Sequence, residues 1–376
     1  MKSDYRRIGD FIRKVSLRNT KLDVTNLMGI NIDKFFMPSV ANTVGTDMSK
    51  YKIVKKGQFA CNRMHVGRDK RLPVALLKED DIIVSPAYDV FEITDQDVLN
   101  PDYLMMWFSR EEFDRNAWFY TDADVRGGLK WEDFCNLQLR APSIVKQNEI
   151  VKEYNVLESR IKLNDGFIEK LEETAHAIYK QWFVSHENSD DEKRVKLDNY
   201  IETNPKLSLK KNTVTTYVEL NDLTTTTMRI TGSIKREFTG GGSKFQNYDT
   251  LLARITPSLE NGKTAFVDIL EEGEIAAGST EFIVMRAKKN ISPYWVYCLA
   301  RDENFRSYAI SSMVGSSGRQ RVNEKYLGEY IVSKIKSEKM NEFHNTVEPI
   351  FGMVKLKSME NGKLSMLKNI LLSKLV

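Results

Sequence analysis

The sequence predicts an α+β protein made of two similar domains and two long helices. Three observations support this prediction: the chain resembles itself at an offset of about 191 to 193 residues, each copy contains short strand-like segments separated by polar turns, and each copy ends in a long heptad-like run. The chain has 376 residues, of which 41% are hydrophobic and 29% are charged. This size and composition fit two globular domains and exclude the disordered and disulfide-scaffold classes.

Four pairs of segments define the repeat. They are 55–63 with 246–254, 84–93 with 277–286, 101–108 with 292–299, and 125–134 with 317–327. We expect, in this order, an extended segment ending in arginine, a polar turn that opens a strand, a short buried helix, and a basic glycine-bearing loop followed by a strand that leads to a long helix. The glycines at 240–242 predict a mobile loop.

The end of each copy predicts a long amphipathic helix. Apolar residues recur in alternating steps of four and three, which is the seam of a coiled coil, and a helix of about 40 residues, roughly 60 Å long, needs a partner. Two seams are therefore expected to pair. The first contains Ile150, Tyr154, Leu157, Ile161, Asn164, Ile168, Leu171, Ala175, Ile178 and Trp182, and the second contains Phe343, Val347, Ile350, Val354, Leu364, Leu371 and Leu375.

Irregular residues modify both seams. Asn164 interrupts the first seam, where a polar residue either fixes the register of the helix pair or is simply exposed on a drifting stripe. Pro349, Gly352 and Gly362 predict a kink or a late start in the second helix. The expected order is a domain at 1–143, a helix at 144–185, a charged linker at 186–200, a domain at 201–336 and a helix at 337–376.

Motifs for catalysis and metal binding are missing from the sequence. The three cysteines and four histidines lack zinc-site spacing, and 240–244 (GGGSK) lacks the spacing of a phosphate-binding loop. Asn100-Pro101-Asp102-Tyr103 resembles the motif of amino-methyltransferases only superficially, because Asp102 replaces a proline and no glycine-rich S-adenosylmethionine loop accompanies it. We therefore expect no catalytic residues, no metal and no bound cofactor. The absence of an apolar span and of a signal peptide predicts a cytoplasmic protein.

Polar loops that recur in both copies favour binding to DNA. Lysine and arginine total 56 against 52 aspartate and glutamate, a formal net charge of +4, so local basic patches carry this inference and the overall charge does not. Arginine can pair with guanine, asparagine with adenine, and lysine suits phosphates. The candidates are Asn62, Arg63, His65, Arg68, Lys70, Arg71, Tyr88, Arg126 and Lys130 in copy one, and Lys235, Lys244, Arg254, Ser258, Lys263, Ser279, Thr280, Arg319, Gln320, Arg321 and Asn323 in copy two.

These features together resemble the specificity subunit of a type I restriction-modification enzyme over the full length of the chain. The resemblance rests on 55–68, 84–88 (VSPAY), 104–108 (LMMWF), 131–134 (WEDF) and 147–150 (QNEI), in this order and duplicated. It implies two target recognition domains that each read half of a bipartite DNA site. It also implies an antiparallel helix pair that sets the spacer and docks two methyltransferase subunits, which would bind S-adenosylmethionine.

The resemblance further implies restriction subunits carrying a translocation motor, DNA methylation in a bacterial or archaeal host, and no catalysis by this chain alone. Two alternatives stay open. A stand-alone DNA-binding regulator that dimerises through its helices would also explain the basic loops and the seams. An enzyme acting by itself would have to transfer a methyl group from S-adenosylmethionine without a partner.

Overall fold

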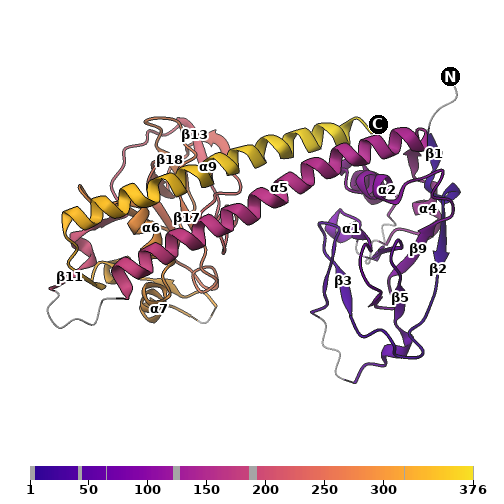
Figure 1. Cartoon of the computed structure of the whole chain (residues 1–376), viewed down its shortest axis with the longest axis horizontal. Coiled ribbons are helices and arrows are strands. Elements are labelled where there is room, and N and C mark those ends of the chain that lie inside the picture. The colour runs from indigo at the N-terminus through magenta and orange to yellow at the C-terminus, as the bar shows by residue number, and fades with distance from the viewer. Residues whose placement is uncertain are drawn as a thin grey trace. The chain divides into compact units, whose positions relative to one another are not determined.

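The computed structural model in Figure 1 describes residues 5–40, 45–64, 66–121, 128–185, 193–316 and 318–375. The chain divides into two compact units. Unit 1 comprises Met1–Arg160 and Leu364–Val376, and unit 2 comprises Ile161–Lys363. Helices and strands occur in both units, which confirms the predicted mixed class.

Unit 1 is built on a four-stranded antiparallel sheet with the order β2-β9-β6-β7. Its strands are β2 (Ile12–Val15), β6 (Phe59–Cys61), β7 (Val74–Leu76) and β9 (Asp89–Ile93). Two-stranded pairs join β1 (Tyr5–Arg7) to β10 (Gln138–Arg140), β3 (Met28–Ile30) to β4 (Phe36–Pro38), and β5 (Lys52–Val54) to β8 (Ile82–Val84). The helices are α1 (Val66–Asp69), α2 (Pro101–Phe108), α3 (Glu111–Phe119) and α4 (Trp131–Asn136), with 3-10 turns η1 (Ile8–Asp10) and η2 (Met48–Lys50).

Helix α2 shows how the sequence forms the core of unit 1. The Asn100 side chain caps the helix by accepting from the backbone N–H groups of Asp102 and Tyr103, and Pro101 occupies the first turn, where its missing N–H costs nothing. The helix buries Phe108 against Phe59 and Phe91 of the sheet, whose rings stack with centroids 5.1 Å apart. The predicted short buried helix at 101–108 is thus confirmed.

Unit 2 repeats this plan. Its central sheet has the order β12-β19-β16-β17, and a second sheet has the order β14-β13-β18-β15. The strands are β11 (Arg194–Lys196), β12 (Ile201–Thr203), β13 (Val214–Val218), β14 (Ile234–Glu237), β15 (Ser243–Phe245), β16 (Thr250–Ala253), β17 (Thr264–Phe266), β18 (Ala276–Gly278), β19 (Phe282–Ala287), β20 (Met313–Val314), β21 (Arg321–Val322) and β22 (Ile331–Ser333). The helices are α6 (Pro293–Arg301), α7 (Glu303–Ser311) and α8 (Glu324–Leu327), with 3-10 turns η4 (Leu197–Asn199) and η5 (Leu220–Asp222).

The duplication extends through the sheet topology. The sheet β2-β9-β6-β7 corresponds strand for strand to β12-β19-β16-β17, and the pairs β1-β10 and β5-β8 correspond to β11-β22 and β15-β18. Helices α2, α3 and α4 correspond to α6, α7 and α8 in chain order. One difference stands out: the hairpin β3-β4 is joined by residues 31–35, whereas β13-β14 is joined by residues 219–233.

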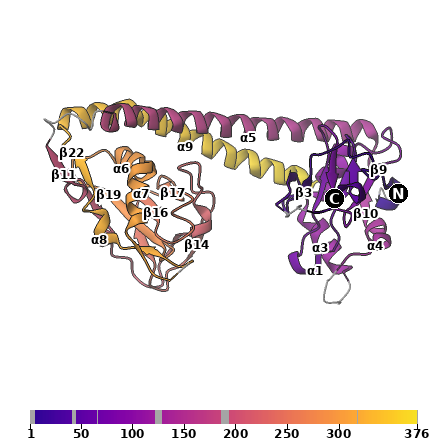
Figure 2. The same cartoon turned by 90° about the horizontal axis from the view of Figure 1, so that it is seen from below.

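Both predicted long helices are present. Helix α5 (Ile144–Tyr179) has 36 residues and continues into the π-helical turn η3 (Lys180–Val184), and α9 (Ser337–Ser373) has 37 residues. In unit 2 the two helices are antiparallel, because Trp182 lies against Phe343 while Asn164 bonds to Asn361 (Figure 2). In unit 1, Lys368 of α9 lies 3.4 Å from Glu158 of α5 and over the ring of Tyr154.

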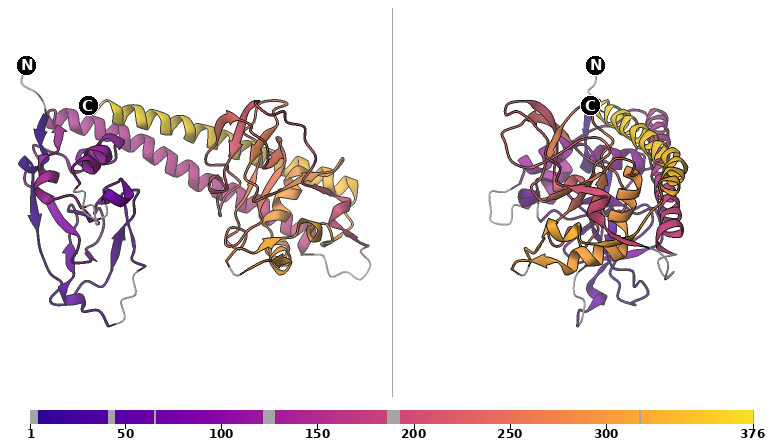
Figure 3. Two further views of the ribbon diagram at one scale, coloured as in Figure 1. Left: turned by 180° about the vertical axis from the view of Figure 1, so that it is seen from behind. Right: turned by 90° about the vertical axis from the view of Figure 1, so that its left-hand side faces the viewer.

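The seam residues line the buried sides of these helices. Each is buried or half-buried, including Ile168, Phe343, Val347 and Val354 in the core of unit 2 and Leu375 in the core of unit 1. Helix α6 lies between the helix pair and the central sheet of unit 2, with the ring of Tyr294 4.5 Å from that of Phe351 (Figures 2 and 3).

Several expectations differ from the structure. Helix α9 begins at Ser337, so the late start does not occur, and it continues through Pro349 and both glycines because the buried neighbours Val347 and Phe351 offset the hydrogen bond that proline removes; the kink stays a prediction. Residues 131–136, predicted to lead from loop to strand, form helix α4, and the strand begins at Gln138. Residues 194–199 of the expected linker form β11 and η4.

The glycines at 240–242 connect β14 to β15 in a conformation that favours glycine, and the mobility expected of this loop stays a prediction. All three glycines have positive φ, and a Cβ on Gly242 would stand 2.3 Å from the carbonyl oxygen of Gly278. Only glycine fits this approach to β18. Among the described residues, no helix is long and apolar enough to cross a membrane.

Candidate nucleic-acid interface

In each unit, an arginine that follows a central strand binds the segment that precedes α4 in unit 1 and α8 in unit 2. In unit 1, Arg63 follows β6, its backbone carbonyl accepts from the N–H of Leu129 at 3.0 Å, and its guanidinium donates to the carbonyl of Leu129. In unit 2, Arg254 follows β16, its carbonyl accepts from the N–H of Val322 at 2.9 Å, and its Nη2 donates to the carbonyl of Val322 at 3.1 Å. We call these two arrangements the arginine clamps.

The clamp of unit 1 is also an ion pair. Arg63 Nε lies 2.6 Å from Asp89 Oδ2, and Lys14 Nζ lies 2.6 Å from Asp89 Oδ1. Burial raises the pKa of Asp89, but the hydrogen bond from Lys14 and the charge of Arg63 outweigh it and lower that pKa overall. The Arg63 side chain is 17% exposed and its guanidinium lies 5.7 Å from the ring of Trp131. The guanidinium groups of Arg63 and Arg254 are therefore bonded to groups of their own domains. The sequence did not indicate this structural role.

Cations after the first clamp surround α1 and the end of α3. Arg68 pairs with Asp69, Arg71 Nη1 lies 3.0 Å from Asp33, and Lys70 Nζ lies 5.0 Å from the ring of Trp118. These pairs are exposed, so each cation can exchange its partner for a phosphate at little cost. The surface formed by Arg68, Lys70 and Arg71 is named the first basic surface.

The other candidates of copy one are more scattered. Asn62 closes a turn by accepting from the N–H of Met64 at 3.1 Å, and Tyr88 is half-buried against the cluster of Val54 and Val84. Lys130 is exposed immediately before α4. His65 and Arg126 lie outside the described residues.

The candidates of copy two gather beside the second clamp. Arg321 pairs with Glu281, whose pKa is lowered chiefly by this hydrogen bond, and Ser279 Oγ accepts from the N–H of Glu281 at 3.1 Å. The backbone of Gln320 is held next to the second clamp, because its carbonyl accepts from the N–H of Thr256 at 3.0 Å. Thr280 is exposed next to these residues. The surface formed by Ser279, Thr280, Arg319, Gln320 and Arg321 is named the second basic surface.

Arg319 is the most available cation of the second basic surface. Its side chain is exposed, and within residues 5–40, 45–64, 66–121, 128–185, 193–316 and 318–375 its guanidinium has no ion pair or hydrogen bond. Gly315 and Gly318 beside it have positive φ. The turn therefore presents Arg319 to solvent with its full bidentate donor set.

The remaining candidates of copy two stabilise other parts of the domain. Lys244 donates to the carbonyl of Leu207 at 3.2 Å, and Lys263 donates to that of Leu220 at 3.1 Å. Lys235 pairs with Glu274 at 2.8 Å. Asn323 caps α8 by accepting from the N–H of Lys325, and Ser258 is half-buried in the turn after the clamp.

An aromatic group beside the first basic surface was not predicted. Trp118, Phe119 and Tyr120 at the end of α3 are 44%, 79% and 52% exposed, although this helix buries Phe113 and Ala117. The signal was available in the sequence, because Trp118 and Phe119 fall outside the spacing of the buried face. Across the described parts of the chain, no group of three metal-binding side chains occurs.

The fold and these surfaces define a class: two repeated α+β domains, each with a clamped loop bearing cations, and a pair of long helices. No protein-family model matches the chain. A curated relative, the type I restriction enzyme HindI specificity subunit of Haemophilus influenzae, is 25% identical over 186 residues. That match covers 47% of this chain and 40% of the relative, so it spans less than half of that protein's length.

A solved structure supports the same class over nearly the whole chain. The type I restriction-modification S subunit from M. genitalium aligns with a TM-score of 0.56 at 14% identity, covering 99% of this chain and 95% of that one. Another similar structure, of a type I restriction-modification system, aligns with a TM-score of 0.46 at 14% identity over 99% of this chain. The match to the M. genitalium subunit thus shows that the chain has the fold of a type I specificity subunit, as its sequence resemblance suggested.

Proposed function

We propose that this chain is the DNA-specificity subunit of a type I restriction-modification complex and that it is non-catalytic by itself. Each domain reads one half of a bipartite DNA site, and the helix pair sets the spacer between the halves. The observation that carries the proposal is the duplication: in two domains of one topology, an arginine after a central strand binds a cation-bearing segment, which holds Lys130 before α4 in unit 1 and Arg319 and Arg321 before α8 in unit 2.

The two basic surfaces supply different contacts in this proposal. The exposed pairs of the first surface suit phosphates, because binding there releases counterions and makes affinity salt-dependent. Arg319 suits a base edge, since an unpaired guanidinium on a short loop can reach guanine with two hydrogen bonds. The exposed aromatic group of α3 provides an apolar contact next to Lys70.

Exposed apolar residues on the long helices support docking of methyltransferase subunits. On the part of α5 that lies in unit 2, Leu163 and Phe167 are 69% and 46% exposed and are separated by one helical turn. Such a stripe, separate from the buried seam, fits a further helix. Helix α9 also exposes apolar side chains, which are Leu356 and Met359 in unit 2 and Met366, Leu367 and Ile370 in unit 1.

The methyltransferase subunits would hold the S-adenosylmethionine, and restriction subunits carrying the translocase would join the same cytoplasmic assembly. The test is co-purification of the full chain with a type I methyltransferase subunit, followed by DNA binding. We expect a complex larger than the chain alone that binds a bipartite duplex with one preferred spacer. A stable homodimer that binds DNA equally well without the methyltransferase would instead support the stand-alone regulator.

A further inference from the structure

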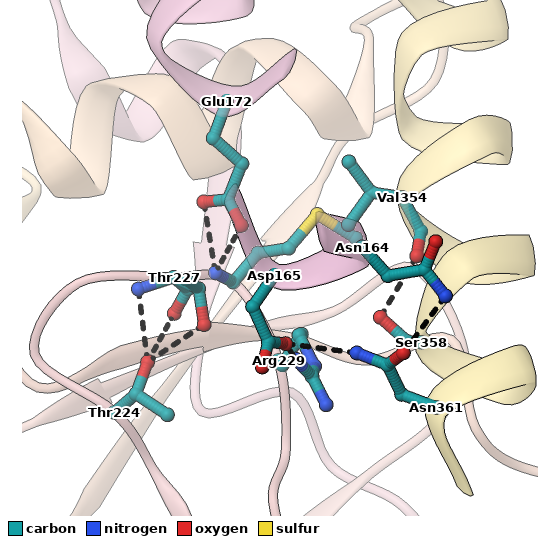
Figure 4. Close-up of polar contacts among 10 residues, drawn as sticks. Asn164, Asp165, Glu172, Thr224, Thr227, Arg229, Val354, Ser358 and Asn361 are labelled. Carbon is teal, nitrogen blue, oxygen red and sulfur yellow. Dashed lines mark hydrogen bonds and ion pairs between the residues drawn. The ribbon is translucent and has the colours of Figure 1, made fainter. Parts of the chain in front are cut away.

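A group of polar side chains, of which Asn164, Glu172 and Asn361 are buried, joins α5 to α9 and to the β13-β14 connection within unit 2 (Figure 4). Asn164 Nδ2 donates to Asn361 Oδ1 at 2.9 Å, and both residues are 3% exposed. Asn361 Nδ2 in turn donates to Asp165 Oδ1 at 2.8 Å. One amide of α9 therefore bonds to two consecutive residues of α5.

The same helix face binds the connection between β13 and β14. Asp165 Oδ1 also accepts from Arg229 Nη1 at 2.7 Å. Two turns further along α5, both carboxylate oxygens of Glu172 accept from the N–H of Met228 at 2.9 Å, and Glu172 Oε2 accepts from the Tyr297 hydroxyl of α6 at 2.9 Å. The polar junction is defined as Asn164, Asp165, Glu172, Met228, Arg229 and Asn361.

The β13-β14 connection has hydrogen bonds of its own and is also bonded to the central sheet. The polar junction therefore positions the sheet of the second domain as well as this connection. Thr224 Oγ1 accepts from the N–H of Thr227 at 2.9 Å, which fixes the turn before Met228. The carbonyl of Met228 accepts from the N–H of Phe266 in β17 at 3.0 Å. Met228 thus links Glu172 of α5 to the central sheet of the second domain, because its N–H bonds to Glu172 and its carbonyl bonds to Phe266.

The polar junction belongs to one copy of the repeat. The hairpin β3-β4 has only residues 31–35 where β13-β14 has 219–233. At the repeat offset of 193, the positions of Asn164, Asp165 and Glu172 are occupied in α9 by Lys357, Ser358 and Ser365. The first domain is attached to α5 differently, through the backbone N–H of Asn100, which donates to Gln147 Oε1 at 2.9 Å, so among the described residues the attachment through the β13-β14 connection is specific to the second domain.

We propose that the polar junction fixes the register of α5 against α9 and the placement of the second domain on them, and that it thereby determines which spacer length the protein selects. The selection step rests on the proposed function. The physical reason is that the hydrogen bonds from Asn164 to Asn361 and from Asn361 to Asp165 form in one alignment only. A shift along the seam would place them against apolar side chains such as Ile168 and Val354, and an unpaired buried polar group is costly.

The register and placement can be measured on the full chain without DNA. Spin labels at exposed positions 169 of α5, 363 of α9 and 237 of β14 report helix register as the 169–363 distance and domain placement as the 169–237 distance, in a Cys135→Ser background. We expect one narrow distribution for each pair. Asn164→Leu with Asn361→Leu should broaden the 169–363 distribution, and Glu172→Met should broaden the 169–237 distribution.

Two further variants separate positioning from folding. Glu172→Gln keeps an acceptor for the N–H of Met228 and should restore the narrow 169–237 distribution. Arg229→Met removes only the partly exposed bond to Asp165, so it should fold and still broaden that distribution. Unchanged distributions in the folded variants would overturn the proposal.

The spacer step is measured with methyltransferase subunits and duplexes whose spacers differ by one base pair. The asparagine-to-leucine pair should reduce the preference for the best spacer by about tenfold, which corresponds to 1.4 kcal/mol, and Glu172→Gln should retain it. Broadened distances with an unchanged preference would overturn the spacer role alone. Absence of any bipartite preference in the unmodified complex would refute the proposed function, while the distance measurements would still decide the role in positioning.

Discussion

Replacing Arg63 with alanine should destabilise unit 1 more than it changes base specificity. The substitution leaves the Leu129 carbonyl without its side-chain donor and leaves Asp89, which is 7% exposed, with Lys14 as its remaining cation. Breaking a buried ion pair by removing one partner typically costs about 3 to 5 kcal/mol. Because Lys14 stays in place and Arg63 is 17% exposed, we expect about 2 to 3 kcal/mol.

This loss can be measured by thermal unfolding of the full chain. At roughly 2 to 4 °C per kcal/mol for a unit of this size, the transition of unit 1 should fall by about 4 to 12 °C. Arg319→Ala provides the matched control, because that side chain is exposed and its stability effect should stay within about 0.5 kcal/mol.

For DNA recognition, we expect Arg319→Ala to have the larger effect and Arg63→Ala the smaller one. Arg319→Ala should weaken recognition of one half-site by about 1 to 3 kcal/mol, as expected for loss of a bidentate base contact. Arg63→Ala, measured below its unfolding transition, should keep its discrimination among half-site sequences. An Arg63→Ala variant that melts like the unmodified chain but loses base discrimination would refute the structural role assigned to Arg63.

Three further outcomes are expected. Burial raises the pKa of Asp268 from 3.8 to about 6, so the folded state binds more protons than the unfolded state between these pH values, and the stability falls as the pH rises through them. Asp268→Asn should therefore raise the melting temperature by an amount equivalent to about 1 to 2 kcal/mol at pH 7.5 and by little at pH 4, and equal effects at both pH values would contradict this. Leu163→Asp with Phe167→Asp should reduce co-elution with the methyltransferase subunit and leave the melting temperature nearly unchanged, whereas undiminished co-elution would move the docking site elsewhere. Deleting four residues from α5 shortens it by about 6 Å, close to two base pairs, and should change the preferred spacer in binding assays; an unchanged spacer would argue against the helix as the spacer-setting element.

The duplicated fold and the helices could be predicted because their signals are local or periodic. Steps of three and four identify both seams, and the motif Asn100-Pro101 identifies the start of α2. The continuity of α9 through Pro349 could not be predicted, since it depends on the packing of Val347 and Phe351 against distant elements.

The candidate site was predicted less completely, because partners of charged side chains are set by tertiary structure. Arg63 looks like a base-reading residue in the sequence, yet Asp89 and Leu129 occupy its guanidinium from 26 and 66 positions away. Arg319 carried the same signal and is exposed. Asn164 left two readings open, and only the position of Asn361 on the opposite helix shows that it is buried and paired.

The central claim is tested most directly by methylation-aware sequencing of DNA from cells that contain a type I methyltransferase subunit, with and without this chain. We predict a methylated bipartite motif that requires the chain, with one half altered by Arg319→Ala and the other unchanged. Methylation that is identical with and without the chain would contradict the account.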